Sequence, residues 1–206
     1  VAVWGESHQV GLLYYVELPV WAELLVAILF LDLIAQYGVH YLLHHVRWMW
    51  RLHIVHHSDT HVDATTATRH HPGDAAFRLV ASIVAIVVVG IPGLYYLVYR
   101  LITPFFGYFT HANIRLPAPL DRLISYVLVT PDMHKFHHHY QAPWTDSNFG
   151  NIFSFWDRLF GTLVYANTQD IRYGLDLTDD SRDLDFKYQM TLPIDASINT
   201  SVRPGM

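Results

Sequence analysis

The sequence predicts an all-α protein: an integral-membrane helical bundle with a hydrophobic helical hairpin and a cytosolic, histidine-rich helical cap. Three observations lead to this prediction. Hydrophobic residues make up 52% of the 206-residue chain and charged residues only 15%, a balance more apolar than that of a typical soluble domain. The apolar residues gather in two long blocks. The chain also has 15 histidines and no cysteine.

The composition excludes several classes of protein and site. Without cysteine there are no disulfides, thiolate metal sites or cysteine nucleophiles. A formal net charge of -5 argues against a nucleic-acid-binding protein, which needs a basic surface. The chain has no G-x-G-x-x-G motif, so it lacks the usual fingerprint of a nicotinamide or flavin site. The many histidines therefore indicate metal binding or proton chemistry.

The first apolar block covers residues 18–39. As a helix it would extend about 33 Å, enough to cross a hydrocarbon core of about 30 Å. Glu23, Asp32 and Gln36 interrupt this block. Because intramembrane carboxylates rarely face lipid, we expect these three side chains to face the protein interior. The alternative is a buried helix of a soluble protein.

The second apolar block runs from Phe77 to Thr110 and is divided by Gly90-Ile91-Pro92-Gly93, a strong turn signal. Its two arms would be about 21 and 25 Å long as helices, which is short for a full crossing. We therefore expect a hairpin that dips into the bilayer and returns, with both ends on the same side.

Basic residues cluster on both sides of this hairpin, and by the positive-inside rule these flanks are cytoplasmic. They are Arg47, Arg51, Arg69 and Arg78 before its apolar core, and Arg115, Arg122, Lys135 and Arg158 after it. After Tyr165 the chain becomes polar and rich in aspartate. We divide it into a membrane-embedded catalytic domain, residues 1–165, and a polar tail, residues 166–206, which we expect to wrap or to be partly ordered.

Three histidine boxes carry the metal prediction. Each box places its imidazoles at helical spacings of three and four residues, on one face of a helix. The boxes are His40 and His44; His53, His56 and His57; and His134, His137 and His138. Imidazole nitrogen suits iron, zinc or copper. Eight imidazoles exceed the four ligands of one tetrahedral zinc site, so the sequence predicts two metal ions.

The third box lies on a helix with a clear start. Thr130, Pro131 and Asp132 read as an N-cap, an N1 proline and a first-turn acid. Asp132, Asp59 and Asp63 are candidates for orienting ligand imidazoles through the second ring nitrogen. Each of these aspartates could equally well be a helix cap or a solvated charge instead of an orienting group.

The ordered set HxxxH, HxxHH and HxxHH around a hydrophobic hairpin resembles the fatty acid hydroxylase (sterol desaturase) superfamily. Further segments match it: D-S-N-F-G at 146–150, W-D-R-L-F-G-T at 156–162, R-H-H-P-G-D at 69–74 and H-A-N-I at 111–114. The resemblance covers roughly residues 20–165. Each box alone is weak, but the ordered set with the 156–162 block is highly specific.

The resemblance implies the eight box histidines as ligands of two iron ions, with zinc as a possible substitute in the isolated protein. His111 matches the first histidine of a further family pair, but its usual partner is replaced by Arg115, which cannot ligate. The missing ligand is then His71, His61 or a water held by Asn113, with His71 ranked first.

The implied activity is oxidation of a lipid C–H bond with O₂ as co-substrate, either hydroxylation or desaturation. Electrons would come from cytochrome b5, a ferredoxin or a pterin, docked at the cytoplasmic face. The lipid would enter beside Phe105, Phe106, Tyr108 and Phe109, a stripe that also suits interfacial packing. Two rivals remain: a histidine-rich metal-binding or transport protein, and a zinc-dependent lipid hydrolase. The boxes lack the glutamate of HExxH.

Overall fold

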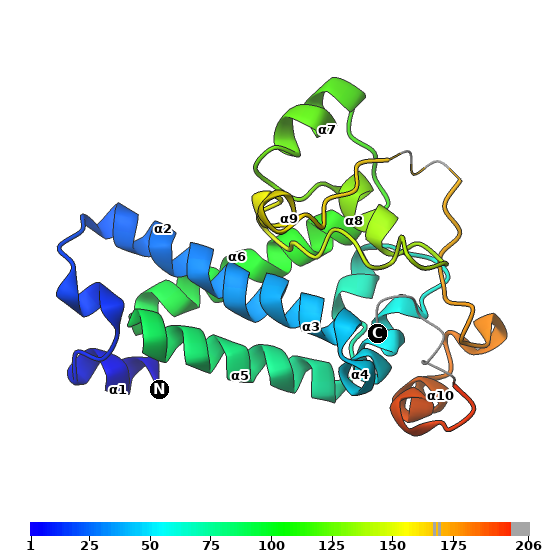
Figure 1. The fold of residues 1–206 in the computed structure, drawn as a ribbon, viewed down its shortest axis with the longest axis horizontal. Coiled ribbons are helices and arrows are strands. Elements are labelled where there is room, and N and C mark those ends of the chain that lie inside the picture. Colours follow the sequence, from blue (N-terminus) through cyan, green and yellow to red (C-terminus); the bar gives the residue numbers. More distant parts are fainter. Residues whose placement is uncertain (167, 169, 199–206) are drawn as a thin grey trace.

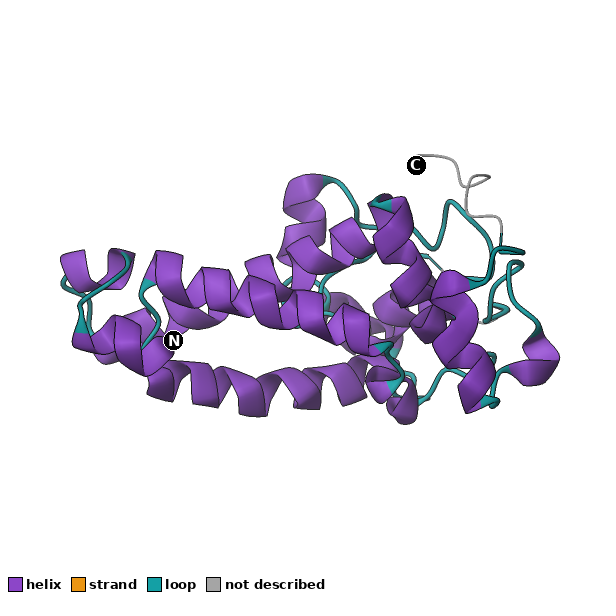
Figure 2. Cartoon of the chain, turned by 90° about the horizontal axis from the view of Figure 1, so that it is seen from below, coloured by secondary structure: helices purple, strands orange, loops and turns teal. Residues whose placement is uncertain are grey.

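The computed structural model describes residues 1–166, 168 and 170–198, and this part of the chain is helical, as the sequence predicts (Figure 2). Its extended pairing is confined to one isolated antiparallel bridge between Leu128 and Phe153. The helices are α1 Ala2–Ser7, η1 Leu12–Tyr15, α2 Val20–Leu31, η2 Asp32–Gly38, α3 Val39–His45, α4 Arg47–His57, η3 Ala64–Thr68, α5 Pro72–Val89, α6 Gly93–His111, α7 Ala118–Ile124, α8 Pro131–His137, α9 Phe155–Phe160, η4 Asp180–Arg182, α10 Phe186–Thr191 and η5 Leu192–Ile194.

The first apolar block forms one continuous helix, Val20–His45, in which α2 and α3 are joined by the π-helical turn η2. Its polar residues face protein partners, as predicted. Glu23 accepts a hydrogen bond from the Tyr95 hydroxyl at 2.8 Å, and Gln36 accepts one from Arg78 at 2.8 Å. Asp32 is fully buried and accepts from two backbone N–H groups and an indole N–H. The carboxylates thus tie this helix to the rest of the protein.

The second apolar block forms the predicted hairpin of α5 and α6, but its arms are longer than expected. His71 caps α5 and Pro72 begins it, so α5 has 18 residues and α6 has 19, or about 27 and 28 Å. The hairpin turns at Gly90, whose φ of 77° is left-handed and whose backbone lies against that of Gly11. A side chain at Gly90 would strain this turn.

Three long helices, Val20–His45, α5 and α6, lie side by side as an elongated bundle (Figure 1). They bury an apolar core that includes Leu31, Ile86 and Tyr99. Val20–His45 and Pro72–Val89 are long and apolar enough to cross a membrane by length and composition. This corrects the expectation that the first arm is too short to cross, because α5 begins at the His71 cap rather than at the first large apolar residue.

The shorter helices α4 and α8 lie towards the end of the bundle where α3 and α6 end and α5 begins, and α7 and α9 lie along the side of the bundle next to α8 (Figure 1). The described part of the polar tail packs against α4. Leu175, Tyr188 and Leu192 join Trp50 and Ile54 in an apolar cluster. The tail therefore covers the outer side of the helix that carries the second histidine box.

Candidate metal centre

Nine buried histidines converge at this end of the bundle in two adjoining groups. In each group the candidate ligand nitrogens all lie within 4.8 Å of one another. The five-histidine group consists of His40, His44, His53, His57 and His137, and the four-histidine group consists of His56, His111, His134 and His138. The groups adjoin where the rings of His57 and His138 stack, 4.5 Å apart between centroids.

Helical spacing explains how the boxes divide between the groups. In α4, His53 and His57 are one turn apart and enter the five-histidine group, while His56 enters the four-histidine group. The third box divides the other way. His134 and His138 enter the four-histidine group and His137 enters the five-histidine group. Each HxxHH box thus serves both groups, whereas the sequence alone suggested that each triplet aims at one point.

Backbone carbonyls and carboxylates hold the imidazoles in place. Four carbonyl oxygens contact ligand Nδ1 atoms: Phe149 with His40 at 2.9 Å, Ser147 with His137 at 2.6 Å, Arg69 with His56 at 3.3 Å and Gly107 with His111 at 2.7 Å. The Asp146 carboxylate lies 3.1 Å from His44 Nδ1, and that of Asp74 lies 2.6 Å from His53 Nδ1. With Nδ1 held in this way, Nε2 faces the interior of each group.

The aspartates predicted for this orienting role have other partners. Asp132 pairs with Lys135 at 3.2 Å and with Arg115 at 3.5 Å. Asp59 accepts a hydrogen bond from the Thr66 hydroxyl, and Asp63 forms the capping box of η3. The contacts of Asp63 and Asp132 are the cap and charge-pair roles given as the alternative, and the orienting groups are instead backbone carbonyls and the carboxylates of Asp74 and Asp146.

The four-histidine group brings ring nitrogens together in a way that suits a cation. The Nδ1 atoms of His56 and His111 face carbonyl oxygens and so carry the ring protons. Their Nε2 atoms, which then present lone pairs, lie 3.2 Å apart. His134 Nε2 lies 2.9 Å from His111 Nε2. Facing lone pairs repel, and a metal ion between them removes the repulsion.

Other ring nitrogens in the two groups are buried without a hydrogen-bond partner in the described part of the chain. They include the Nε2 atoms of His40, His53, His57 and His138. A buried nitrogen without a partner costs about 1–3 kcal/mol. Metal coordination would remove this cost at several positions at once, so the residues present fit a two-metal site.

The electrostatics keep these imidazoles neutral. Burial lowers the pKa of His56, His57, His134 and His138 well below the usual range. Burial also lowers the pKa of His53 to about 4, although the Asp74 carboxylate beside it acts in the opposite direction. Neutral imidazole is the form that ligates metals.

Comparison with known proteins agrees with this geometry. The family model described as fatty acid hydroxylase matches residues 24–162. The chain belongs to this family. It is 31% identical over 134 residues to the ornithine lipid hydroxylase OlsE of Rhizobium tropici, covering 63% of this chain and 39% of that protein.

Two alkylglycerol monooxygenases are also similar. The Caenorhabditis elegans protein is 28% identical over 145 residues, or 69% of this chain and 27% of that protein. The Danio rerio protein is 26% identical over 180 residues, or 85% and 37%. The chain thus spans well under half the length of these curated relatives. No solved structure matches it.

The family motif at 146–150 and the motif at 156–162 meet beside the histidine groups. The buried Asp157 carboxylate accepts hydrogen bonds from Phe149 N at 2.7 Å, Gly150 N at 3.0 Å and the Thr162 hydroxyl at 2.7 Å. The loop that Asp157 holds supplies the Ser147 and Phe149 carbonyls and the Asp146 carboxylate that orient three histidines. These motifs therefore position three of the candidate ligands.

His71, ranked first to complete the ligand set, lies outside both groups. Its Nδ1 accepts the Gly73 N–H at 3.0 Å and caps α5. Its neighbour His70 is closer to the centre. The His70 Nδ1 lies 3.0 Å from Asp74, and its ring stacks on His56 with centroids 4.4 Å apart. The four-residue spacing of His70 and Asp74 was the available signal for this pair.

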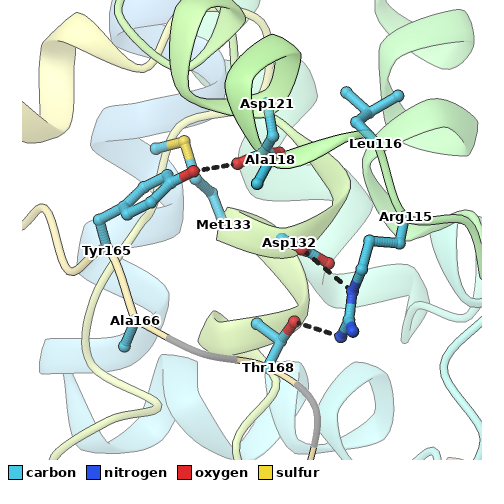
Figure 3. A pocket seen from close by; sticks show the side chains of 9 residues that line it. All are labelled: Arg115, Leu116, Ala118, Asp121, Asp132, Met133, Tyr165, Ala166 and Thr168. Carbon is cyan, nitrogen blue, oxygen red and sulfur yellow. Dashed lines mark hydrogen bonds and ion pairs between the residues drawn. The ribbon is translucent and has the colours of Figure 1, made fainter.

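Arg115, which replaces the second histidine of the family pair, also lies outside both groups. It pairs with Asp132 and donates to Thr168 at 3.2 Å, at the edge of a cavity of about 340 Å³ (Figure 3). His61, another candidate for the missing ligand, is exposed and contacts the Thr60 hydroxyl, and Asn113 is exposed as well. The four-histidine group is therefore assembled without a replacement at position 115.

Proposed function

We propose that this chain is the catalytic core of a membrane-bound di-iron oxygenase that uses O₂ and external electrons to hydroxylate or desaturate a C–H bond of a lipid. The observation that carries the proposal is the pair of adjoining, buried histidine groups, in each of which the ring nitrogens lie within 4.8 Å of one another. Membership of the fatty acid hydroxylase family supports it, as do relatives whose names describe a lipid hydroxylase and monooxygenases.

In this proposal each histidine group holds one iron ion, and zinc can replace iron in the isolated protein. Two bound iron ions would supply the oxidising power for an unactivated C–H bond. The nine grouped histidines are the proposed ligands, which leaves His71 out of the predicted set. The protein's own part is to fix the imidazoles through Nδ1, to keep them neutral by burial, and to keep water away from the reacting carbon.

The proposed substrate position is a cavity of about 340 Å³ beside the two groups, a volume typical of small-ligand sites. Histidines of both groups reach its wall: His40 from one, and His56, His111 and His134 from the other. A lipid chain in this cavity would lie against the metal ions. Of the aromatic stripe predicted to meet the lipid, Tyr108 lines the cavity, whereas Phe105 is 65% exposed.

We propose that Val20–His45 and the α5–α6 hairpin lie in the membrane and that the histidine end faces the cytoplasm. The arginines around this end support the orientation. A basic cytoplasmic surface suits an acidic electron donor such as cytochrome b5 or a ferredoxin, and a pterin is the small-molecule alternative. Most of the grouped histidines lie in α3, α4 and α8, which meet towards one end of the bundle (Figure 1). This arrangement favours an enzyme over a transporter, whose sites would connect the two membrane faces.

Lipid mass spectrometry after expression with and without the chain tests the proposal. We expect an added hydroxyl or double bond in one lipid class, together with O₂ consumption when a donor is supplied. His138→Ala should insert normally but form no product. His8→Ala is the control, because His8 is exposed, directly follows α1 and stacks on Trp4. Wild-type turnover by inserted His138→Ala would refute the ligand assignment.

A further inference from the structure

The wall of the cavity beside the histidine groups also carries basic side chains. Two arginines, Arg78 and Arg100, line it, and no aspartate or glutamate is among the described residues of its wall. Arg78 already has protein partners, since it donates to Asp74 at 2.9 Å and to Gln36 at 2.8 Å. The side chain of Arg100, which lies within α6, has no hydrogen bond or ion pair with any residue in the described part of the chain.

Arg100 lies on the same face of α6 as the metal-binding histidine of that helix. The α6 residues of the cavity wall are Arg100, Thr103, Pro104, Gly107, Tyr108 and His111. Their spacings of three and four residues place them along one stripe. Arg100 is eleven residues from His111, or about 16 Å along the helix axis. The stripe therefore runs from a free guanidinium to the four-histidine group.

A second polar group in the cavity wall also lacks a partner. Asn151 lines the cavity, and its Nδ2 atom is buried with no hydrogen-bond partner in the described chain. Asn151 directly follows the 146–150 motif, next to the loop that orients the ligands. A buried amide donor is costly to leave unpaired, so a ligand oxygen at this position would be stabilised.

An arginine within an apolar hairpin is expensive and usually has a function. We propose that Arg100 binds an anionic group, a carboxylate or a phosphate, of the lipid in this cavity, while the chain of that lipid extends along α6 to the histidine groups. The substrate class is then an anionic lipid that reacts at a carbon several bonds from its charge. The claim that this lipid is the substrate rests on the proposed function. The binding of its anionic group by Arg100 does not require turnover.

The test uses the full chain, metal-loaded, in phosphatidylcholine nanodiscs without an electron donor. Binding of radiolabelled palmitate is compared with that of hexadecanol, a neutral lipid of the same chain length. Palmitoyl lysophosphatidic acid and monopalmitoylglycerol form a second pair, which distinguishes a phosphate from a carboxylate. We expect the wild-type protein to prefer the charged member of one pair by on the order of tenfold to a hundredfold.

Three variants assign this preference. Arg100→Gln should bind charged and neutral lipids equally, and Arg100→Lys should retain part of the preference. Arg47→Gln is the matched control: Arg47 is also exposed but lies outside the cavity, and the substitution removes the same charge from the protein. It should behave as wild type.

A wild-type protein with no charge preference would overturn the inference, even if Arg100→Gln fails to fold. Arg100→Gln that keeps the preference would also overturn it. Because no donor is present, these results do not depend on catalysis. A charge preference without any lipid oxidation in the separate turnover assay would support the anion site and refute the oxygenase.

Discussion

Asp157 lies outside both histidine groups, yet its loss should empty a metal site. The side chain is fully buried and accepts three hydrogen bonds, two from backbone N–H groups and one from a hydroxyl. Asp157→Ala leaves three donors without an acceptor, each at a cost of about 1–3 kcal/mol. We expect the free energy of unfolding to fall by about 3–6 kcal/mol, part of which the loop recovers by moving.

Movement of that loop displaces the carbonyls that hold His40 and His137 and the carboxylate beside His44. All three histidines belong to the five-histidine group. Loss of such orienting contacts typically weakens metal binding by about 10–100-fold. The metal in this group should therefore be lost first, and the four-histidine group should be affected less.

Metal analysis of purified Asp157→Asn measures this effect in a milder variant. The amide keeps the shape of the carboxylate but turns at least one acceptor into a donor. We expect about one metal ion fewer per chain at limiting metal. Asp176→Asn is the control, because Asp176 is an exposed carboxylate in the tail. Full metal content in folded Asp157→Asn, measured under the same conditions, would refute the reasoning.

Three further predictions concern the tail, the family departure and the topology. Arg51→Ala removes a guanidinium that donates to three backbone carbonyls of the tail. It should lower the free energy of unfolding by about 2–4 kcal/mol and speed proteolysis of the tail. Arg47→Ala, the control, should do neither. Arg115→Ala should leave the metal content unchanged and cost under about 1 kcal/mol, because its ion pair is long, at 3.5 Å, and partly exposed to solvent; loss of metal would make Arg115 part of the centre. In the cysteine-free chain, Asn113→Cys should react with an impermeant thiol reagent from the cytoplasmic side and Leu94→Cys should not; equal reaction from that side would refute the hairpin topology.

Sequence patterns predicted those features that depend on local spacing. The apolar block 18–39 and the first histidine box form one long helix, Val20–His45, and the glycines at 90 and 93 bracket the hairpin turn. Eight histidines in three boxes all reached the two groups. Local spacing also specifies which imidazoles share a helix face, which is why the sequence identified so many of them.

What the sequence did not predict depends on contacts that form only when the chain folds. The orienting carbonyls of Ser147 and Phe149 lie 10 and 109 residues from the histidines they contact, and a backbone carbonyl has no sequence signature. The division of each HxxHH box between two groups depends on how α4 and α8 pack. His71 could not be separated from His70 by spacing, because only the folded chain shows that the former caps α5.

The most direct test of the central claim is the number and separation of metal ions per chain. Metal analysis of the iron-loaded wild-type protein, combined with anomalous diffraction, should give two ions per chain, one in each histidine group. We expect the two ions to be about 3.5–7 Å apart, where the lower bound is the separation typical of two-metal sites. A single ion in fully loaded protein, or two ions outside the histidine groups, would contradict a di-iron centre.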